Sequence, residues 1–256
     1  MNSETLFYMN ITQPNSLTQN LADKSAQHQA TLVIFCKRPK LNQGKQRLVK
    51  DSNAESALDV AQALLACAIE DANNWQGPVV IAYSDLADRQ WAQLLTNKAQ
   101  VIAQLPQGSS GNLGDRINYV DSQLRAQGHQ QLIIIGTDAP TLNNGHFQSI
   151  IHVLDNSDIA LSHAGDGGVV IMANKAPWPK LTQLPWSTDK LSHALFALCE
   201  QQQLTVQYSL PGYDIDYIAD LKKLLIDLQS DVRPARQALL QITKQLVLLS
   251  EETTHA

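Results

Sequence analysis

One stretch constrains the fold of this chain more than any other. Four apolar residues, Leu132–Ile135, lead directly into Gly136-Thr137-Asp138-Ala139-Pro140. A run this short and this apolar indicates a strand buried on both faces, as in a parallel sheet. Asp138 then falls just past the carboxyl end of the strand, where open α/β sheets place their ligands. We therefore predict that Asp138 holds a divalent metal ion, which in turn holds a nucleotide diphosphate.

The charge and composition of the chain exclude several classes of function. The net charge is -5 and the pI is near 5.7, so the basic face of a duplex-binding protein is missing. Aromatic residues make up only 5% of the 256 residues, which disfavours stacking on successive bases. We therefore expect no nucleic-acid partner, whereas binding one nucleotide through a metal needs no basic surface.

The sequence also indicates a reducing compartment. Cys36, Cys67 and Cys199 are far apart and form no zinc-type spacing, so buried free thiols are expected. No apolar run approaches the roughly 20 residues of a membrane span. The N-terminus lacks the basic and apolar regions of a secretory signal. We predict a cytoplasmic protein without a membrane span.

The first predicted strand, Thr31–Cys36, is followed by a cationic loop, residues 37–47, that suits phosphate binding. The loop carries five cationic side chains in eleven residues, and Pro39 and Gly44 keep it out of regular structure. Backbone N–H groups and the side chains of Lys or Arg can converge on a phosphate there. The loop is not a Walker A motif, because Pro39 replaces the first glycine. A solvated run of charge is the alternative.

A glycine-rich segment precedes a predicted amphipathic helix that runs to about Gln127. Gly108, Gly111 and Gly114 have the spacing GxxGxxG, which differs from the Rossmann fingerprint. A glycine-rich turn at a helix N-terminus can still receive an anion or the edge of a base. A plain loop with a helix cap is the alternative.

Three further aspartates are candidate site residues. Asp166 lies between glycines, where it either forms a turn or lines the site. Asp214 and Asp216 are alternate residues, so extended backbone directs both carboxylates to the same side. Such a pair can complete a metal site or fix cationic loops. The alternative is a helix cap plus a surface acid.

The domain organisation is predicted to be simple. Residues 1–30 are rich in Asn, Gln, Ser and Thr and are expected to form a flexible extension. Residues 31–256 form the proposed nucleotide-binding domain. The helix predicted for 234–249 carries an apolar stripe that either packs on the sheet or forms the seam of a homodimer.

Several of these motifs, taken in chain order, resemble those of a bacterial family of nucleotide-diphospho-sugar transferase-like proteins, also described as glycosyltransferase A-like or DUF2064-type. The resemblance covers about residues 31–228. The matching residues are Lys37, Pro39, Gly44, Lys45, Arg47 and Leu48; Gln107, Gly111, Leu113, Gly114 and Arg116; 136–140; 166–168; 186–188; and 214–216 with Asp220 and Leu221.

The resemblance implies a GT-A fold, a three-layer α/β/α sandwich around a mostly parallel sheet. It also implies a metal-dependent transferase that takes a nucleotide-diphospho-sugar and an unknown small-molecule acceptor. Mg²⁺ or Mn²⁺ would be held by Asp138 and Asp214, while Asp166 and Asp216 would be catalytic. The predicted nucleotide-binding residues are Lys37, Pro39, Gly44, Lys45, Arg47, Gly108, Gly111 and Arg116.

The chain departs from the family pattern at two places. Gln46 stands where the family usually has threonine, and Val169-Val170 stand where it often has tyrosine. The second change removes a hydroxyl group that could contact a sugar. Two alternatives stay open. One is a nucleotidyltransferase that joins an NTP to a phosphorylated acceptor, and the other is a degenerate domain that only binds a nucleotide or a partner.

Overall fold

The computed structural model describes residues 29–50 and 52–254, so nearly all of the predicted extension, residues 1–30, lies outside the described part of the chain. The strands of the described part are β1 (Thr31–Cys36), β2 (Val79–Tyr83), β3 (Ala99–Ala103), β4 (Leu132–Ile135), β5 (Ile159–His163), β6 (Val169–Asn174) and β7 (Val206–Tyr208). The helices are α2 (Gln46–Val49), α3 (Ala54–Asn74), η1 (Leu86–Asp88), α4 (Arg89–Leu94), α5 (Leu113–Ala126), α6 (Asn144–Asn156), α7 (Leu191–Gln201), α8 (Ile218–Asp227) and α9 (Pro234–Thr254).

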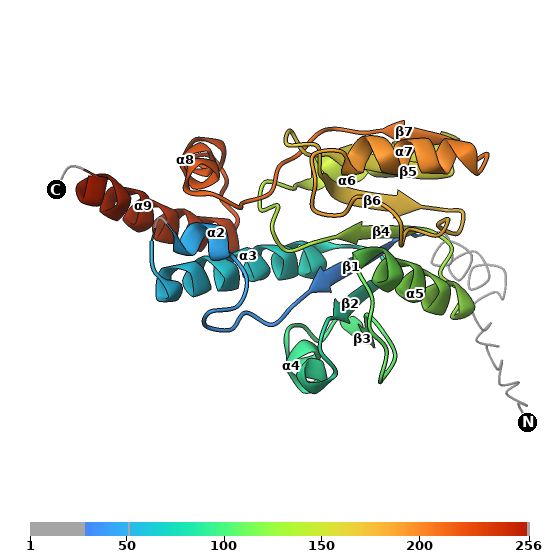
Figure 1. The fold of residues 1–256 in the computed structure, drawn as a ribbon, viewed down its shortest axis with the longest axis horizontal. Helices are drawn as coiled ribbons and strands as arrows, with labels where there is room; N and C mark the ends of the chain where they lie inside the picture. The colour runs from blue at the N-terminus through green and yellow to red at the C-terminus, as the bar shows by residue number, and fades with distance from the viewer. Residues whose placement is uncertain (1–28, 51, 255–256) are drawn as a thin grey trace, which may run out of the picture.

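The strands form one sheet in the order β3-β2-β1-β4-β6-β5-β7 (Figure 1). β6 runs antiparallel to both of its neighbours, β4 and β5, and every other pair is parallel. The expected mostly parallel sheet is confirmed. Because β1 to β4 are parallel, the loops that follow them leave from the same edge of the sheet.

Helices cover both faces of this sheet, which confirms the predicted three layers. On one face the side chains of α3, α4 and α6 pack on alternate strand residues such as Leu32, Ile34 and Ile133. On the other face α5 and α7 pack on Val33 and Ile134. All four residues of β4 are buried, as the apolar run predicts for a strand covered on both sides.

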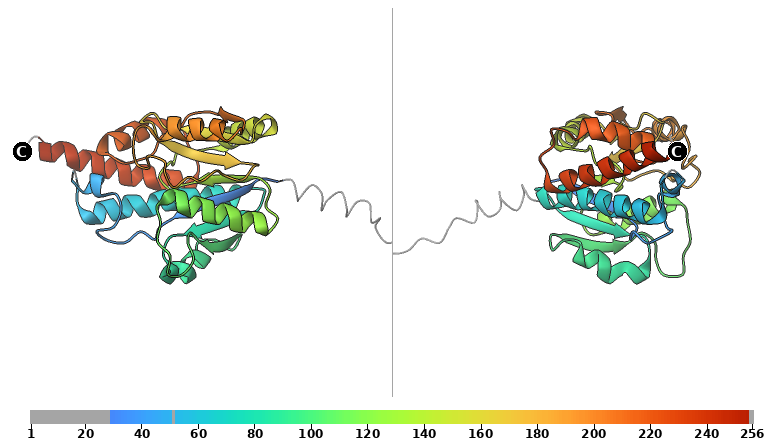
Figure 2. Two further views of the ribbon diagram at one scale, coloured as in Figure 1. Left: turned by 45° about the vertical axis from the view of Figure 1, so that its right-hand side comes forward. Right: turned by 90° about the vertical axis from the view of Figure 1, so that its left-hand side faces the viewer.

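The C-terminal helix α9 packs on α3 and α8 and lies one layer away from the sheet. Leu239 and Leu246 of α9 are buried with Leu64 of α3 and Leu224 of α8 in a third apolar cluster. Two views show α3 and α9 side by side (Figure 2). Much of the apolar surface of α9 is therefore used within this chain, while the homodimer stays a prediction.

Candidate active site

Asp138 lies in the turn after β4, and a second segment from far along the chain is fastened to it. The backbone carbonyl of Asp138 accepts a hydrogen bond from the Ile215 N–H at 2.9 Å. Upstream of Ile215, the Gly212 N–H bonds to the His163 carbonyl at the end of β5. These two bonds bring the Asp214–Asp216 segment to the carboxyl end of β4.

The side chain of Lys45 joins these two acidic segments. Its Nζ lies 3.1 Å from Asp138 Oδ1, 3.3 Å from Asp216 Oδ1 and 2.5 Å from the Ile215 carbonyl oxygen. Only 8% of the Lys45 side chain is exposed, whereas 48% of the Asp138 side chain is. The structure thus brings together three of the predicted site residues and turns the Lys45 ammonium toward carboxylates.

Arg47 extends the same cluster toward solvent. Its Nη1 lies 2.6 Å from Asp216 Oδ2, and its guanidinium lies over the ring of Tyr217. Lys45 and Arg47 follow Gly44, which has a φ of 77°. A one-turn helix, α2, begins at Gln46, so the predicted loop is helical over its last residues.

The pKa of Asp214 indicates that negative charges are crowded around this residue. Burial, together with repulsion from Asp166, Asp216 and Asp138, raises the pKa of Asp214 to about 6. Asp166 is exposed in the turn between β5 and β6, where its carboxylate accepts the Gly168 N–H at 3.0 Å. The four predicted acids therefore lie near one another, and Lys45 and Arg47 supply positive charge among them.

A pocket of about 230 Å³ opens beside these acids, with Asp138 and Asp214 in its lining. Its other walls include Phe35, Ile117, Val169, Val170, Met172 and Trp186. The two valines at the family's tyrosine position thus form an apolar part of the pocket wall. An apolar pocket with a few charged groups at one side is typical of small-molecule sites.

The other predicted nucleotide-binding residues have separate partners. The Arg116 guanidinium donates to the Gln104 side chain at 3.2 Å and to the Ser84 carbonyl at 3.4 Å. Gly108 has a φ of 78° in the loop after β3, and a Cβ at Gly111 would contact the Asp115 side chain. Gln104, which the sequence motifs did not single out, also donates to carbonyls of β1 and β2.

The first half of the cationic loop is partly neutralised by another acid. Arg38 and Lys40 lie 3.6 Å and 3.2 Å from the buried carboxylate of Asp88. Lys37 is exposed, and Pro39 is half-buried. The loop is therefore held down at Asp88 by its first half and at Asp216 by its second half.

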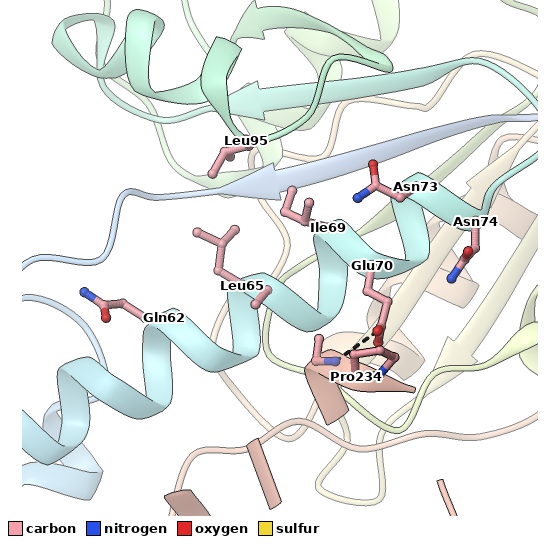
Figure 3. Close-up of a pocket in the computed structure, with 10 residues that line it drawn as sticks. Gln62, Leu65, Ile69, Glu70, Asn73, Asn74, Leu95 and Pro234 are labelled. Atoms are coloured by element: carbon pink, nitrogen blue, oxygen red, sulfur yellow. Dashed lines mark hydrogen bonds between the residues drawn. The ribbon is translucent and has the colours of Figure 1, made fainter. Parts of the chain in front are cut away.

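A larger and more open groove, of about 650 Å³, lies on α3 beside α4 and the start of α9 (Figure 3). Its apolar floor includes Leu65 and Ile69, and Glu70 accepts the Ala235 N–H at 2.9 Å. None of the predicted site residues lines it. We therefore place the candidate site in the smaller pocket, where the carboxylates converge.

A buried arginine that was not part of any sequence motif donates hydrogen bonds to the turn that follows Asp138. Arg236 of α9 is fully buried and donates to the Pro140 carbonyl at 3.1 Å and to the Leu142 carbonyl at 3.3 Å. Its charge is balanced by Glu70 and Asp71 of α3, at 2.9 Å and 2.6 Å. A sequence signal existed, because Arg236 shares a helix face with buried leucines and such a cation needs a carboxylate partner.

No group of three His, Cys, Asp or Glu side chains in the described part of the chain is arranged to hold a metal ion unaided. Magnesium is commonly held by one or two carboxylates, with waters and substrate phosphates as the other ligands. Asp138 and Asp214 supply oxygen donors of that kind. Their chemistry fits a metal that is shared with a bound diphosphate.

Comparison with known proteins identifies the middle of the chain. Residues 67–188 match the family described as "Uncharacterized protein conserved in bacteria (DUF2064)". The match covers slightly less than half of the chain. The DUF2064 segment contains Arg116, Asp138 and Asp166, whereas Lys45 and Asp214–Asp216 lie outside it. The resemblance inferred from the motifs is confirmed.

Solved structures support the fold. A protein of Desulfovibrio desulfuricans G20, provisionally named a nucleotide-diphospho-sugar transferase, superposes with a TM-score of 0.75 at 19% identity, covering 86% of this chain and 97% of that one. This likeness establishes the α/β architecture of nucleotide-diphospho-sugar transferase-like proteins.

Two other structures are more distant. A cytidylyltransferase of Leptospira borgpetersenii has a TM-score of 0.49 at 14% identity and covers 84% of this chain and 93% of that one. A protein of Mycobacterium tuberculosis H37Rv, solved in complex with manganese, has a TM-score of 0.44 at 16% identity and covers 79% and 98%.

No curated protein is similar in sequence to this chain.

Within the described residues, no helix is both long and apolar enough to cross a membrane. The three cysteines are free and buried, as expected.

Proposed function

We propose that this protein is a metal-dependent transferase that uses a nucleotide-diphospho-sugar as donor and a small molecule as acceptor. The observation that carries the proposal is the meeting of Asp138 and Asp216 at the Lys45 ammonium, beside an apolar pocket at the carboxyl end of a parallel sheet. In open α/β sheets this edge is where ligands bind.

In this proposal each charged residue has a distinct task. Lys45 and Arg47 neutralise the phosphates of the donor, and Asp138 and Asp214 hold Mg²⁺ or Mn²⁺. When bound, the metal supplies stabilisation of the leaving diphosphate. Asp166, exposed near Asp214, faces the acceptor, and Asp216 acts as the base. Lys37, Pro39, Gly44, Gly108, Gly111 and Arg116 border the nucleotide.

Calorimetric titration tests the proposal directly. UDP and GDP are titrated into the protein with and without Mn²⁺, and binding is expected only with the metal. Asp138→Ala is expected to abolish this binding, whereas Asp155→Ala, which removes an exposed acid on α6, is expected to leave it unchanged. Metal-independent binding, or equal binding by Asp138→Ala, would contradict the proposal.

The products distinguish this chemistry from its rivals. A sugar transferase releases a nucleoside diphosphate from the donor, whereas a nucleotidyltransferase releases pyrophosphate from an NTP. A degenerate domain would bind nucleotide and release neither. Separate assays for released nucleoside diphosphate and for released pyrophosphate, with the Asp138→Ala variant as the blank, distinguish these outcomes.

A further inference from the structure

The ammonium of Lys45 occupies the position of a cation between two carboxylates. An ammonium has three N–H donors, and Lys45 Nζ lies within 3.3 Å of three oxygens, on Asp138, Asp216 and Ile215. Two are carboxylate oxygens and one is a backbone carbonyl oxygen. Hard divalent cations prefer the same ligands, so Lys45 is a stand-in for such a cation.

We infer that Lys45 is the resident counter-cation of Asp138 and Asp216, and that it transfers to the diphosphate when a divalent cation binds to Asp138. The inference rests on the proposed function. A divalent cation bonded to Asp138 would take the carboxylate that the ammonium now contacts. The Lys45 ammonium, which lies 3.1 Å from the same carboxylate, would then be repelled by the like charge of the metal. Its flexible four-carbon stem allows it to move away.

The backbone at Lys45 is suited to this movement. Lys45 has φ 46° and ψ 32°, a left-handed conformation that residues other than glycine seldom adopt. This conformation is unfavourable for an L-residue. In the structure the three Nζ contacts hold the side chain in place. Loss of these contacts frees the segment after Gly44 to relax, and the ammonium moves with it.

This exchange couples the two ligands of the site. The metal has to displace Lys45, so metal alone binds with a penalty. Once a diphosphate is present, the displaced ammonium gains a new anionic partner, which offsets that penalty. By linkage, metal and diphosphate each strengthen the binding of the other through the same side chain.

The first experiment titrates Mn²⁺ alone into the full-length protein. Lys45→Met is expected to bind Mn²⁺ at least about fivefold more tightly than wild type, the low end of usual coupling between sites. Lys50→Met is the matched control, because it removes one exposed lysine just after α2. An equal gain in both variants, or no Mn²⁺ binding by Lys45→Met, overturns the inference.

A second experiment uses wild-type protein and therefore does not depend on the folding of a variant. Acetylation by an N-hydroxysuccinimide ester is followed residue by residue by mass spectrometry. Lys45, only 8% exposed, is expected to react slowly without metal and several-fold faster with saturating Mn²⁺, while exposed Lys50 stays constant. Equal protection of Lys45 in both states overturns the inference.

The two proposals fail in different ways. If Mn²⁺ displaces Lys45 but no nucleotide binds, the proposed function is wrong and the exchange stands. If nucleotide binds with Mn²⁺ but Lys45→Met leaves the affinity for Mn²⁺ alone unchanged, the exchange is wrong and the proposed function stands.

Discussion

At the scale of single residues, the acids of the site differ in how their charge is balanced. Asp138 and Asp216 each have the Lys45 ammonium within 3.3 Å. The pKa of Asp214 is instead raised to about 6 by burial and by the neighbouring carboxylates. Such repulsion makes the carboxylate bind a proton more readily than an unperturbed aspartate does until a cation arrives.

Replacing Asp214 by Asn is expected to stabilise the metal-free protein at neutral pH. Because the pKa is higher in the folded state, the folded protein binds more protons, so stability falls as pH rises from about 4 to above 6. Asn removes this loss. With a chelator present, the melting temperature of Asp214→Asn should exceed that of wild type at pH 7.5, and the gap should narrow toward pH 4. A gap that is independent of pH would contradict this assignment.

Gly114 allows α5 to pack closely against Leu181 and Trp186. The GxxGxxG motif did not predict this packing role. A Cβ at Gly114 would lie 2.4 Å from the Leu181 carbonyl oxygen and 2.8 Å from Trp186 Nε1. We expect Gly114→Ala to lower the free energy of unfolding by about 1–3 kcal/mol, measured by urea denaturation. Gly165→Ala, where the added Cβ meets open space, should change it by less than about 0.5 kcal/mol. Equal effects would argue against this close approach.

At the scale of secondary-structure elements, α9 is joined to the site through Arg236. The guanidinium connects α3 to the turn that follows Asp138, through carboxylates on one side and the Pro140 and Leu142 carbonyls on the other. Arg233 adds a bond to the same Leu142 carbonyl at 2.9 Å. The backbone of the turn is thus held from α9 as well as by Ile215.

Arg236→Met is expected to destabilise the protein by about 3–5 kcal/mol, because it removes the ion pair of Glu70 and leaves Asp71 with Arg233 alone. Arg236→Lys should recover part of this loss, since it keeps the charge but not the forked geometry. Urea denaturation measures both variants. Arg89→Met, at an exposed position on α4, is the control. A loss no larger than that of the control would show that the network contributes little.

Local patterns predicted the elements better than the contacts between them. The apolar run of β4 and the β-branched run of β1 identified both strands, because burial on two faces leaves a short continuous signal. The sequence also grouped Asp214 with Asp216. It did not show that Lys45 would pair with Asp216, 171 positions away, because that contact depends on the bond between the loop after β7 and the Asp138 carbonyl.

At the scale of the whole molecule, binding at the site should raise global stability, because a ligand that prefers the folded state shifts the unfolding equilibrium. At about 100 times its Kd, a ligand contributes about 2.7 kcal/mol. For a chain of this size this corresponds to about 5–10 °C in Tm. We expect Mn²⁺ with UDP or GDP to produce such a shift in differential scanning fluorimetry.

Chelation of the metal should reverse that shift, and Asp138→Ala should not show it. An equal shift in Asp138→Ala would place the ligand elsewhere, and the larger groove on α3 would be the next site to examine.

The position of Arg236 has a consequence for synthesis on the ribosome. The sheet strands and the Asp138 turn emerge before α9, and N-terminal parts generally fold first during translation. Until residue 236 leaves the exit tunnel, the Pro140 carbonyl and the carboxylates of α3 lack their guanidinium partner. The Asp138 turn therefore reaches its final form only after α9 has emerged, so under the proposed function nascent chains halted before α9 should not retain nucleotide.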